Sequence, residues 1–439
     1  MNPREAALAA LERCRRDGAW SGAAIDMAIK RYSLDRRDGA LASRLCLGVL
    51  QNSRLLDFYI NCYSNIPVEK LEVKVRDILR LGIYQLTMLD KIPARAAVNE
   101  SVALCKSSGC ARASGLVNAV LRKIAGSAGN LPPIPGEGTA EYLSIKYSHP
   151  RWIAERIIQE KGYDFAEGFL AANNCPPSLD LQINTLKTGK ESILRSLLRL
   201  EIEFSVPAYP ENCLSLKGGN VSALPGFEEG LFYVQDRAAA MAVSILGLRP
   251  GMRVLDACAA PGGKSFAAAV AMENQGSILS CDIHEKKLPL IESGAKRLGI
   301  EILSTCQADA REPVTQLQDR FDAVIADVPC SGLGVIRKKP EIREKTGEET
   351  ARLPQIQRDI LENISRCVRP GGVLLYSTCT VLQEENEDVV GWFLRRHSEF
   401  EAEEFSVGAR CAEKGMYTFW PHVDGTDGFF AAKLRRKIG

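Results

Sequence analysis

Two cysteines in the C-terminal half of the chain have the setting of reactive thiols. Cys330 lies in the segment Asp327–Gly332, and Cys379 lies in the segment Ser377–Thr380. Each follows a short apolar run of the kind that forms a buried strand. Ligands of a doubly wound sheet bind outside the carboxyl ends of its strands. We therefore expect both thiols to face one crevice, the alternative being two buried cysteines without chemistry.

A third segment has the composition of a ligand-binding loop. It follows a strand expected at 252–257, it opens a helix, and it reads Asp256-Ala257-Cys258-Ala259-Ala260-Pro261-Gly262-Gly263-Lys264-Ser265. Its glycines let the backbone approach a ligand closely, and the start of a helix directs amide groups toward the same place. The spacing fits neither a P-loop nor a dinucleotide fingerprint.

Carboxylates stand at the ends of the following strands. Asp282 ends the strand expected at 277–282 and is placed to accept hydrogen bonds from ribose hydroxyls. Asp309 follows the strand at 301–306 and could meet an adenine amino group, or it could cap a helix. Asp327 ends the strand at 321–327. Carboxylates in this register suit a cationic adenosine cofactor, and S-adenosylmethionine fits.

Two thiols beside such a cofactor suit methylation of carbon-5 of cytosine. This carbon is a poor nucleophile until a thiolate adds at carbon-6 of the ring. The adduct must then lose a proton and expel the thiol, so one cysteine can attack while a second assists release. Asp327 is placed to contact the base, and Lys264 could lower the pKa of the attacking thiol.

The 439 residues imply two or three domains. Residues 1–130 have helical periodicity, 139–245 form a small α+β subdomain, and 246–439 alternate strand and helix as a Rossmann-like α/β domain does. The segment Leu131–Gly138 is a proline-rich linker. Near the C-terminus, residues 417–420 and 428–434 predict a strand pair, whereas 401–416 predict only an exposed loop.

Charge and composition narrow the setting. Residues 1–130 hold 20 Lys and Arg against 12 Asp and Glu, a net charge of +8 that suggests a polyanionic partner or simply a basic surface. The 14 cysteines are scattered, and we interpret all but two as buried free thiols. The four histidines lie far apart, which argues against a metal site. With no apolar run near ~20 residues and no signal peptide, a cytoplasmic protein is expected, with no membrane partner.

At this point the motifs resemble those of a known family, the RNA 5-methylcytosine methyltransferases of the Sun/Nop2 type, and among them the bacterial ones acting on small-subunit ribosomal RNA. The resemblance covers nearly the whole chain and includes a NusB-type RNA-binding domain at residues 1–127. It is carried by Asp256–Lys264, Asp282, Asp309, Asp327–Gly332, Ser377–Thr380, Gln182–Lys187, Val335–Lys338, Pro340–Ile342 and Asp427–Phe430.

The resemblance implies a role for each site residue. Cys379 would be the nucleophile, Cys330 would assist product release, and Asp327 would contact both cofactor and base. The loop Cys258–Lys264, with Asp282 and Asp309, would hold S-adenosylmethionine. The expected substrate is a cytosine of 16S ribosomal RNA, free or early in assembly, modified by a monomer. The alternatives are the same chemistry on transfer RNA and a non-catalytic RNA-binding factor.

Overall fold

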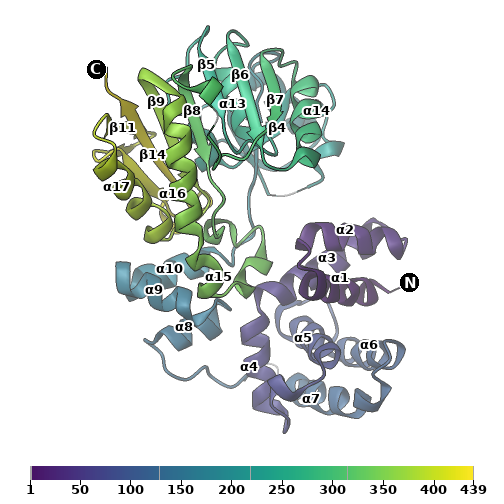
Figure 1. Ribbon diagram of the computed structural model, residues 1–439. Helices are drawn as coiled ribbons and strands as arrows, with labels where there is room; N and C mark the ends of the chain where they lie inside the picture. Colours follow the sequence, from purple (N-terminus) through teal and green to yellow (C-terminus); the bar gives the residue numbers. More distant parts are fainter. Residues whose placement is uncertain (1, 128, 218, 314, 439) are drawn as a thin grey trace. The chain divides into compact units, whose positions relative to one another are not determined.

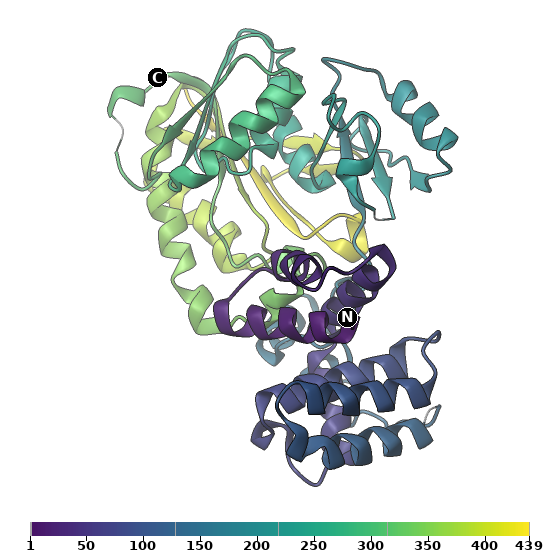
Figure 2. The ribbon, with the colours of Figure 1, turned by 90° about the vertical axis from the view of Figure 1, so that its right-hand side faces the viewer.

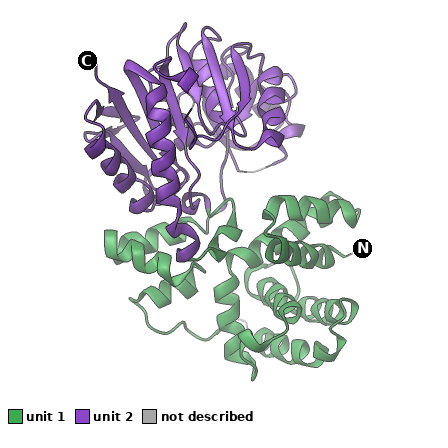
Figure 3. Ribbon diagram, in the orientation of Figure 1, with its two compact units in different colours: residues 1–175, 336–346 green, residues 176–335, 347–439 purple. Residues whose placement is uncertain are grey.

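The computed structural model describes residues 2–127, 129–217, 219–313 and 315–438. The chain forms two compact units (Figure 3). Unit 1 comprises residues 1–175 together with 336–346, and unit 2 comprises 176–335 together with 347–439. The chain thus leaves unit 2 after Val335 and returns to it at Gly347. In the part of the chain that is described, no helix is long and apolar enough to cross a membrane.

The regular elements of unit 1 are helices wherever its residues are described, as predicted for residues 1–127. They are α1 (Pro3–Asp17), α2 (Ser21–Arg31), α3 (Arg36–Gln51), α4 (Ser53–Tyr63), α5 (Val73–Met88), α6 (Ala94–Ser107), α7 (Ser114–Gly126), α8 (Ala140–Lys146), α9 (Arg151–Lys161) and α10 (Tyr163–Ala172), with 3-10 turns at Val68–Lys70, Ala111–Ala113 and Pro340–Glu344. Helix α1 begins where the Asn2 side chain accepts from the amide of Arg4, and it ends at Gly18 in the left-handed region. One apolar core joins α1 to α7.

The segment 336–346 belongs to unit 1 although it follows the Cys330 segment in sequence. Its Arg343 side chain is 1% exposed. One guanidinium nitrogen donates to the carbonyl oxygens of Gln51 (2.6 Å), Tyr147 (2.8 Å) and Ser148 (3.1 Å), and the other donates to that of Asn173 (3.2 Å). Sequence patterns did not predict this insertion.

Unit 2 contains a small antiparallel sheet in the strand order β2-β3-β1-β4. Its strands are β1 (Leu179–Ile183), β2 (Phe204–Ser205), β3 (Cys213–Leu216) and β4 (Phe232–Val234). Helix α11 (Lys190–Arg199) packs Ile193 and Leu197 into the apolar core of this sheet. These elements lie within the stretch 139–245 predicted to be an α+β subdomain, but helices α8 to α10 of that stretch belong to unit 1.

The main sheet of unit 2 has eight strands in the order β10-β14-β9-β8-β5-β6-β7, with β13 paired to β14. They are β5 (Arg253–Asp256), β6 (Ser277–Asp282), β7 (Leu303–Gln307), β8 (Phe321–Asp327), β9 (Val368–Thr378), β10 (Phe400–Ala402), β13 (Met416–Phe419) and β14 (Phe429–Arg436). The pairs from β9 through β8, β5 and β6 to β7 are parallel, and β14 is antiparallel to β9. The carboxyl ends of five strands therefore meet at one edge.

Helices cover both faces of this sheet (Figures 1 and 2). The first face carries α12 (Arg237–Ser244), α13 (Gly263–Ala271) and α14 (Leu288–Leu298); the second carries α16 (Leu353–Ile364) and α17 (Glu387–Arg396). The remaining elements of unit 2 are α15 (Gly347–Ala351), α18 (Pro421–Asp424) and 3-10 turns at Val221–Ala223, Glu285–Lys287, Thr315–Leu317, Leu333–Val335, Ser365–Cys367 and Gln383–Glu385.

The exposed loop predicted for residues 401–416 is wrong. Strand β10 extends the main sheet along β14, and β11 (Phe405–Val407) pairs with β12 (Arg410–Ala412) in a hairpin. Gly408 turns this hairpin in the left-handed region, with φ of 59°. Strands of three residues are too short to show an alternating pattern in the sequence.

Candidate active site

The two cysteines lie side by side. Strands β8 and β9 are parallel neighbours, and Asp327 at the end of β8 is paired with Ser377 near the end of β9. Cys330 and Cys379 follow these ends, and their sulfur atoms are 3.2 Å apart. Each residue is partly exposed. The strand ends thus bring both sulfur atoms to the same edge of the sheet, where one crevice was expected to contain them.

Hydrogen bonds join the segments that carry the two thiols. The Gly334 amide donates to the Cys379 carbonyl (2.9 Å), and the hydroxyls of Ser331 and Thr380 are 2.7 Å apart. Gly334 also contacts Gly428 closely: a Cβ on Gly334 would lie 1.8 Å from the Gly428 carbonyl oxygen. Glycine is therefore required at position 334, and hydrogen bonds connect the two segments.

An ion pair stands beside the thiols. Lys264 Nζ lies 2.7 Å from Asp327 Oδ2, and the Ser377 hydroxyl donates to Asp327 Oδ1 (2.9 Å). Burial alone lowers the pKa of Lys264, but the carboxylates of Asp327 and Asp256 outweigh burial and hold its pKa above the usual value. This ammonium also interacts electrostatically with Cys379. A positive charge is thus held near Cys379, and the predicted effect of Lys264 on the pKa of that thiol stays a prediction.

The hydrogen bond with Cys379, together with burial, raises the pKa of Cys330 well above its usual value. Cys330 therefore keeps its proton in the free protein at neutral pH. As a thiol it can donate a hydrogen bond to the Cys379 sulfur, 3.2 Å away.

The glycine-rich loop follows β5 and opens α13. Gly262 caps this helix in the left-handed region with φ of 108°, and a Cβ there would lie 2.5 Å from the Phe266 ring. Asp282 Oδ2 accepts a hydrogen bond from the Ala260 amide (3.2 Å). The loop residues Cys258, Ala259, Ala260, Pro261, Gly262, Gly263 and Lys264 therefore lie beside Asp282, at the same edge as the thiols.

Asp256 lies under this loop and is fully buried. Burial raises its pKa to about 7, although the Ser265 hydroxyl donates to Oδ2 (2.7 Å). Its other oxygen, Oδ1, has no hydrogen-bond partner among the described residues.

Asp309 follows β7, but its carboxylate is engaged locally. It accepts from the Arg311 amide (3.0 Å) and forms an ion pair with the Arg311 side chain (2.5 Å). The hydrogen bond from the Arg311 side chain lowers the pKa of Asp309. Asp309 therefore closes a turn rather than capping an α-helix, and its contact with adenine stays a prediction.

Sequence reasoning missed a buried pair behind the Cys330 segment. Glu385 and Gln357 are both fully buried. Glu385 Oε2 accepts from the Ser331 amide (2.9 Å) and from Gln357 Nε2 (2.8 Å). Burial raises the pKa of Glu385. The one signal available was an acidic residue six positions after Cys379, which in a sequence looks like part of a solvent-exposed turn.

Other cysteines behave differently from the prediction that they are buried. Cys62, Cys175, Cys306 and Cys411 are exposed, so the prediction is wrong for these four. Cys62 lies on α4, Cys306 on β7 and Cys411 on β12, and Cys175 follows α10. Among the described residues, no group of three or more His, Cys, Asp or Glu side chains could hold a metal ion.

Comparisons with known proteins agree with this geometry. Residues 243–435 match the family described as 16S rRNA methyltransferase RsmB/F, residues 1–126 match the NusB family, and residues 149–222 match the ferredoxin-like domain of RsmF/B-like methyltransferases. The predicted fold class, a helical NusB-like domain, a small α+β domain and a Rossmann-like methyltransferase domain, is confirmed.

Relatives match over their full length. Probable ribosomal RNA small subunit methyltransferase B of Bacillus subtilis strain 168 is 35% identical, over 99% of this chain and 98% of that protein. The protein of the same name from Synechocystis is 34% identical, over 99% of this chain and 100% of its own length. The crystal structure of PH0851 has a TM-score of 0.84 at 28% identity and covers 99% of both chains.

The fold and the comparisons define an S-adenosylmethionine-dependent RNA methyltransferase. More particularly, the chain belongs to the RsmB/F family of 16S rRNA methyltransferases and carries the NusB domain at its N-terminus. The resemblance found in the sequence motifs is confirmed.

Proposed function

We propose that the protein methylates carbon-5 of one cytosine in 16S ribosomal RNA through a covalent adduct with Cys379. The observation that carries this proposal is the 3.2 Å separation of the Cys330 and Cys379 sulfur atoms beside the Lys264–Asp327 ion pair. A methyltransferase acting on an atom that is already nucleophilic has no need of two adjacent thiols. We further propose that it acts in the cytoplasm, as a monomer.

The residues at the strand ends fit the cofactor. The Asp282 carboxylate stands at this edge, where it suits a cationic cofactor, and Asp256 Oδ1 is a buried acceptor without a partner among the described residues. The Gly262 turn leaves room for backbone contact. We assign the loop Cys258–Lys264 and Asp282 to binding S-adenosylmethionine, with Asp309 as the adenine contact. The cofactor supplies the methyl group.

The proposed reaction begins with addition of the Cys379 thiolate to carbon-6 of cytosine. This forms a carbon–sulfur bond and makes carbon-5 nucleophilic toward the methyl group. Carbon-5 then gives its proton to water, the electron pair of that carbon–hydrogen bond re-forms the double bond between carbon-5 and carbon-6, and the bond between carbon-6 and the Cys379 sulfur breaks. Cys330 assists this release, because its thiol lies 3.2 Å from the Cys379 sulfur and can protonate it as it departs.

Asp327 and Lys264 are proposed to act on the base and on the thiolate. The Asp327 carboxyl group holds the ring of cytosine. It lies at the end of β8, the strand next to β9, after which the nucleophile follows. Lys264 stabilises negative charge on Cys379 through a site that excludes much of the solvent, since its side chain is only 12% exposed.

The proposed target is 16S ribosomal RNA, free or early in assembly. The relatives named as small-subunit ribosomal RNA methyltransferases match over the full length of this chain. The N-terminal 130 residues carry a net charge of +8, which supports contacts with phosphates that do not depend on sequence. The base must leave its stack to reach the thiols, so an unpaired or exposed cytosine is expected.

Transfer of tritium from labelled S-adenosylmethionine tests the proposal. Purified protein is incubated with deproteinised 16S RNA and, separately, with bulk transfer RNA, and the labelled nucleoside is identified after digestion. We expect label in 5-methylcytidine of 16S RNA only. Label in transfer RNA would move the target, and label in a base other than cytosine would refute the proposed chemistry.

Two variants separate the roles of the thiols. Cys379→Ala should abolish transfer, whereas Cys330→Ala should leave a protein–RNA adduct that survives denaturing electrophoresis. Cys62→Ala is a matched control, because Cys62 is an exposed thiol of unit 1. An adduct formed by Cys379→Ala, or none formed by Cys330→Ala under turnover, would contradict the role assignment.

A further inference from the structure

The peptide groups on either side of Cys330 are held by two buried side chains that the reaction as proposed does not use. Gln357 Nε2 donates to the Pro329 carbonyl oxygen (3.0 Å), which precedes Cys330. Glu385 Oε2 accepts from the Ser331 amide (2.9 Å), which follows Cys330. The two side chains also bind each other (2.8 Å). Together they grip the backbone on both sides of one thiol.

Each member of this pair comes from an element that fixes its position. Gln357 lies on α16, whose apolar side packs on the second face of the main sheet. Glu385 ends the 3-10 turn Gln383–Glu385, and its backbone carbonyl accepts from the Tyr376 hydroxyl of β9 (2.6 Å). A side chain locked in this way holds its partner more precisely than one in a loop.

The burial of these polar groups has a cost that packing does not explain. Neither side chain is exposed. Glu385 Oε1 and Gln357 Oε1 have no hydrogen-bond partner among the described residues, and an unsatisfied buried acceptor costs roughly 1–3 kcal/mol. Two apolar side chains would fill the same volume without that cost. Positioning of the Cys330 backbone explains why polar groups are present instead.

The hydrogen bonds of the pair go to the backbone of Pro329 and Ser331 on either side of Cys330 and, on β9, to the Tyr376 hydroxyl. The Cys379 segment is held by Asn386, the residue after Glu385, which accepts from the Thr378 hydroxyl (2.6 Å) and donates to the Thr380 carbonyl (3.2 Å). A defect in the pair should therefore displace Cys330 more than Cys379, to which it is transmitted only through the contact between the Ser331 and Thr380 hydroxyls and the segment around Gly334.

We propose that Glu385 and Gln357 are positioning residues that set the Cys330 thiol for release of the covalent adduct. This inference rests on the roles proposed above for the two cysteines. Its consequence is a split between two steps: loss of the pair slows resolution of the adduct while addition of Cys379 to the base continues. A misplacement of about 1 Å can cost on the order of 10²-fold in rate, and we expect a loss of that size in turnover.

The test compares two substitutions of Glu385, one that removes its side-chain hydrogen bonds and one that keeps them. Glu385→Leu removes the acceptor for Ser331 and for Gln357. Glu385→Gln keeps an amide oxygen that can accept both hydrogen bonds, because both reach the same oxygen in the wild-type protein. Gln357→Leu removes the donor from the other side. Gln355→Leu is the matched control, since Gln355 lies on the same helix and is exposed.

Three readouts are measured for each variant: methyl transfer at steady state, the fraction of protein in an adduct resistant to denaturation, and S-adenosylmethionine binding. For Glu385→Leu and Gln357→Leu we expect turnover to fall about 10²-fold, the adduct fraction to rise toward that of Cys330→Ala, and cofactor binding to stay unchanged. Glu385→Gln should restore release, and Gln355→Leu should resemble the wild type.

The outcomes keep the two proposals apart. If Cys330→Ala itself gives no adduct, the proposed function fails. If Cys330→Ala gives an adduct but turnover of the Leu variants falls with no rise in adduct, the inference is overturned and the pair is merely structural. Loss of cofactor binding together with turnover in both Leu variants would overturn it as well, because that pattern indicates general unfolding of the unit.

Discussion

Arg343 offers a sharp test of the discontinuous architecture of unit 1. We predict that Arg343→Met destabilises unit 1 although the residue lies between the two cysteines in the sequence. The guanidinium donates to four backbone carbonyls, as described above, and to the Asn174 side chain (2.5 Å). These acceptors come from α3, from the turn after α8 and from the end of α10, so one side chain joins three separate stretches of the chain.

The size of the effect follows from the acceptors. Methionine has a similar length but no donor, so it fills the volume and leaves the carbonyls unpaired. Each buried acceptor left unpaired costs roughly 1–3 kcal/mol. Relief from burying a positive charge offsets part of this cost. Water will reach some of the carbonyls, and we therefore expect a net loss on the order of 3 kcal/mol for unit 1.

The assay must report on each unit separately, because a chain with two compact units does not unfold as one two-state system. Hydrogen exchange followed by mass spectrometry does so. A loss of about 3 kcal/mol raises exchange through opening of unit 1 by about two orders of magnitude. Peptides of α8, α9 and α10 should show this rise, and peptides of β8 and β9 should not.

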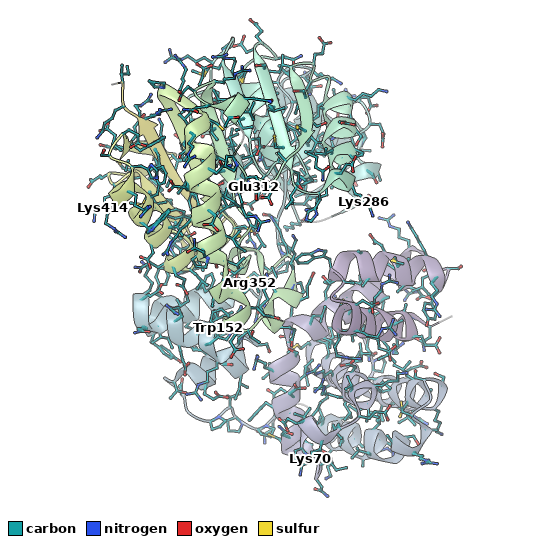
Figure 4. The ribbon with its side chains drawn as sticks, viewed as in Figure 1. Lys70, Trp152, Lys286, Glu312, Arg352 and Lys414 are labelled. Carbon is teal, nitrogen blue, oxygen red and sulfur yellow. The ribbon has the colours of Figure 1, made fainter. Side chains whose placement is uncertain are left out.

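The control is Arg352→Met, a change of an exposed arginine just before α16 in unit 2 (Figure 4). It should leave exchange unchanged throughout the chain. The segment 336–346 has a second contact within unit 1, because Trp152 Nε1 of α9 donates to the Lys345 carbonyl (3.2 Å). Wild-type exchange in α8–α10 of the Arg343→Met protein, or an equal rise in both units, would refute the reasoning.

Two further predictions concern the catalytic unit. Burial raises the pKa of Asp256 from 3.8 to about 7, so its favourable contribution to stability is complete below about pH 4 and is lost as the pH rises to 7. The free energy of unfolding of Asp256→Asn should rise relative to that of the wild type by on the order of 4 kcal/mol between pH 4 and pH 8. A difference in melting temperature between variant and wild type that is the same at pH 5 and pH 8 would contradict this. Gly334→Ala should cost at least tenfold in methyl transfer because its Cβ would lie 1.8 Å from the Gly428 oxygen; Gly115→Ala, where nothing lies within 4 Å, is the control, and equal activity of the two variants would disprove the steric argument.

The strand ends could be predicted because their residues depend on local pattern. Strand β8 is a continuous buried run that ends at Asp327, and parallel neighbours must end at one edge whatever the rest of the chain does. Chemistry-bearing residues just after such runs therefore come together. The same logic placed Asp282 beside the loop that precedes α13.

The insertion of residues 336–346 into unit 1 could not be predicted in this way. Its residues are mostly charged, and a charged residue is assigned to the surface unless a partner is known. The partners of Arg343 are backbone carbonyls, which every residue possesses, and they lie 170 to 292 positions away in sequence. No residue type in the segment signals that contact.

Glu385 and Gln357 show the same limit of prediction from sequence at the site itself. A carboxylate and an amide are normally exposed, and their burial is tolerated here because fixed donors and acceptors on the backbone meet them. Those donors exist only once β8 and β9 have ended side by side. The residues that we propose to perform the chemistry can thus be found from strand ends alone, whereas the residues that we propose to position them become recognisable only when the strands have been brought together. Glu385→Leu places an apolar side chain in a largely apolar core. For the reason given, it should nevertheless slow release of the adduct more than many changes nearer to the thiols.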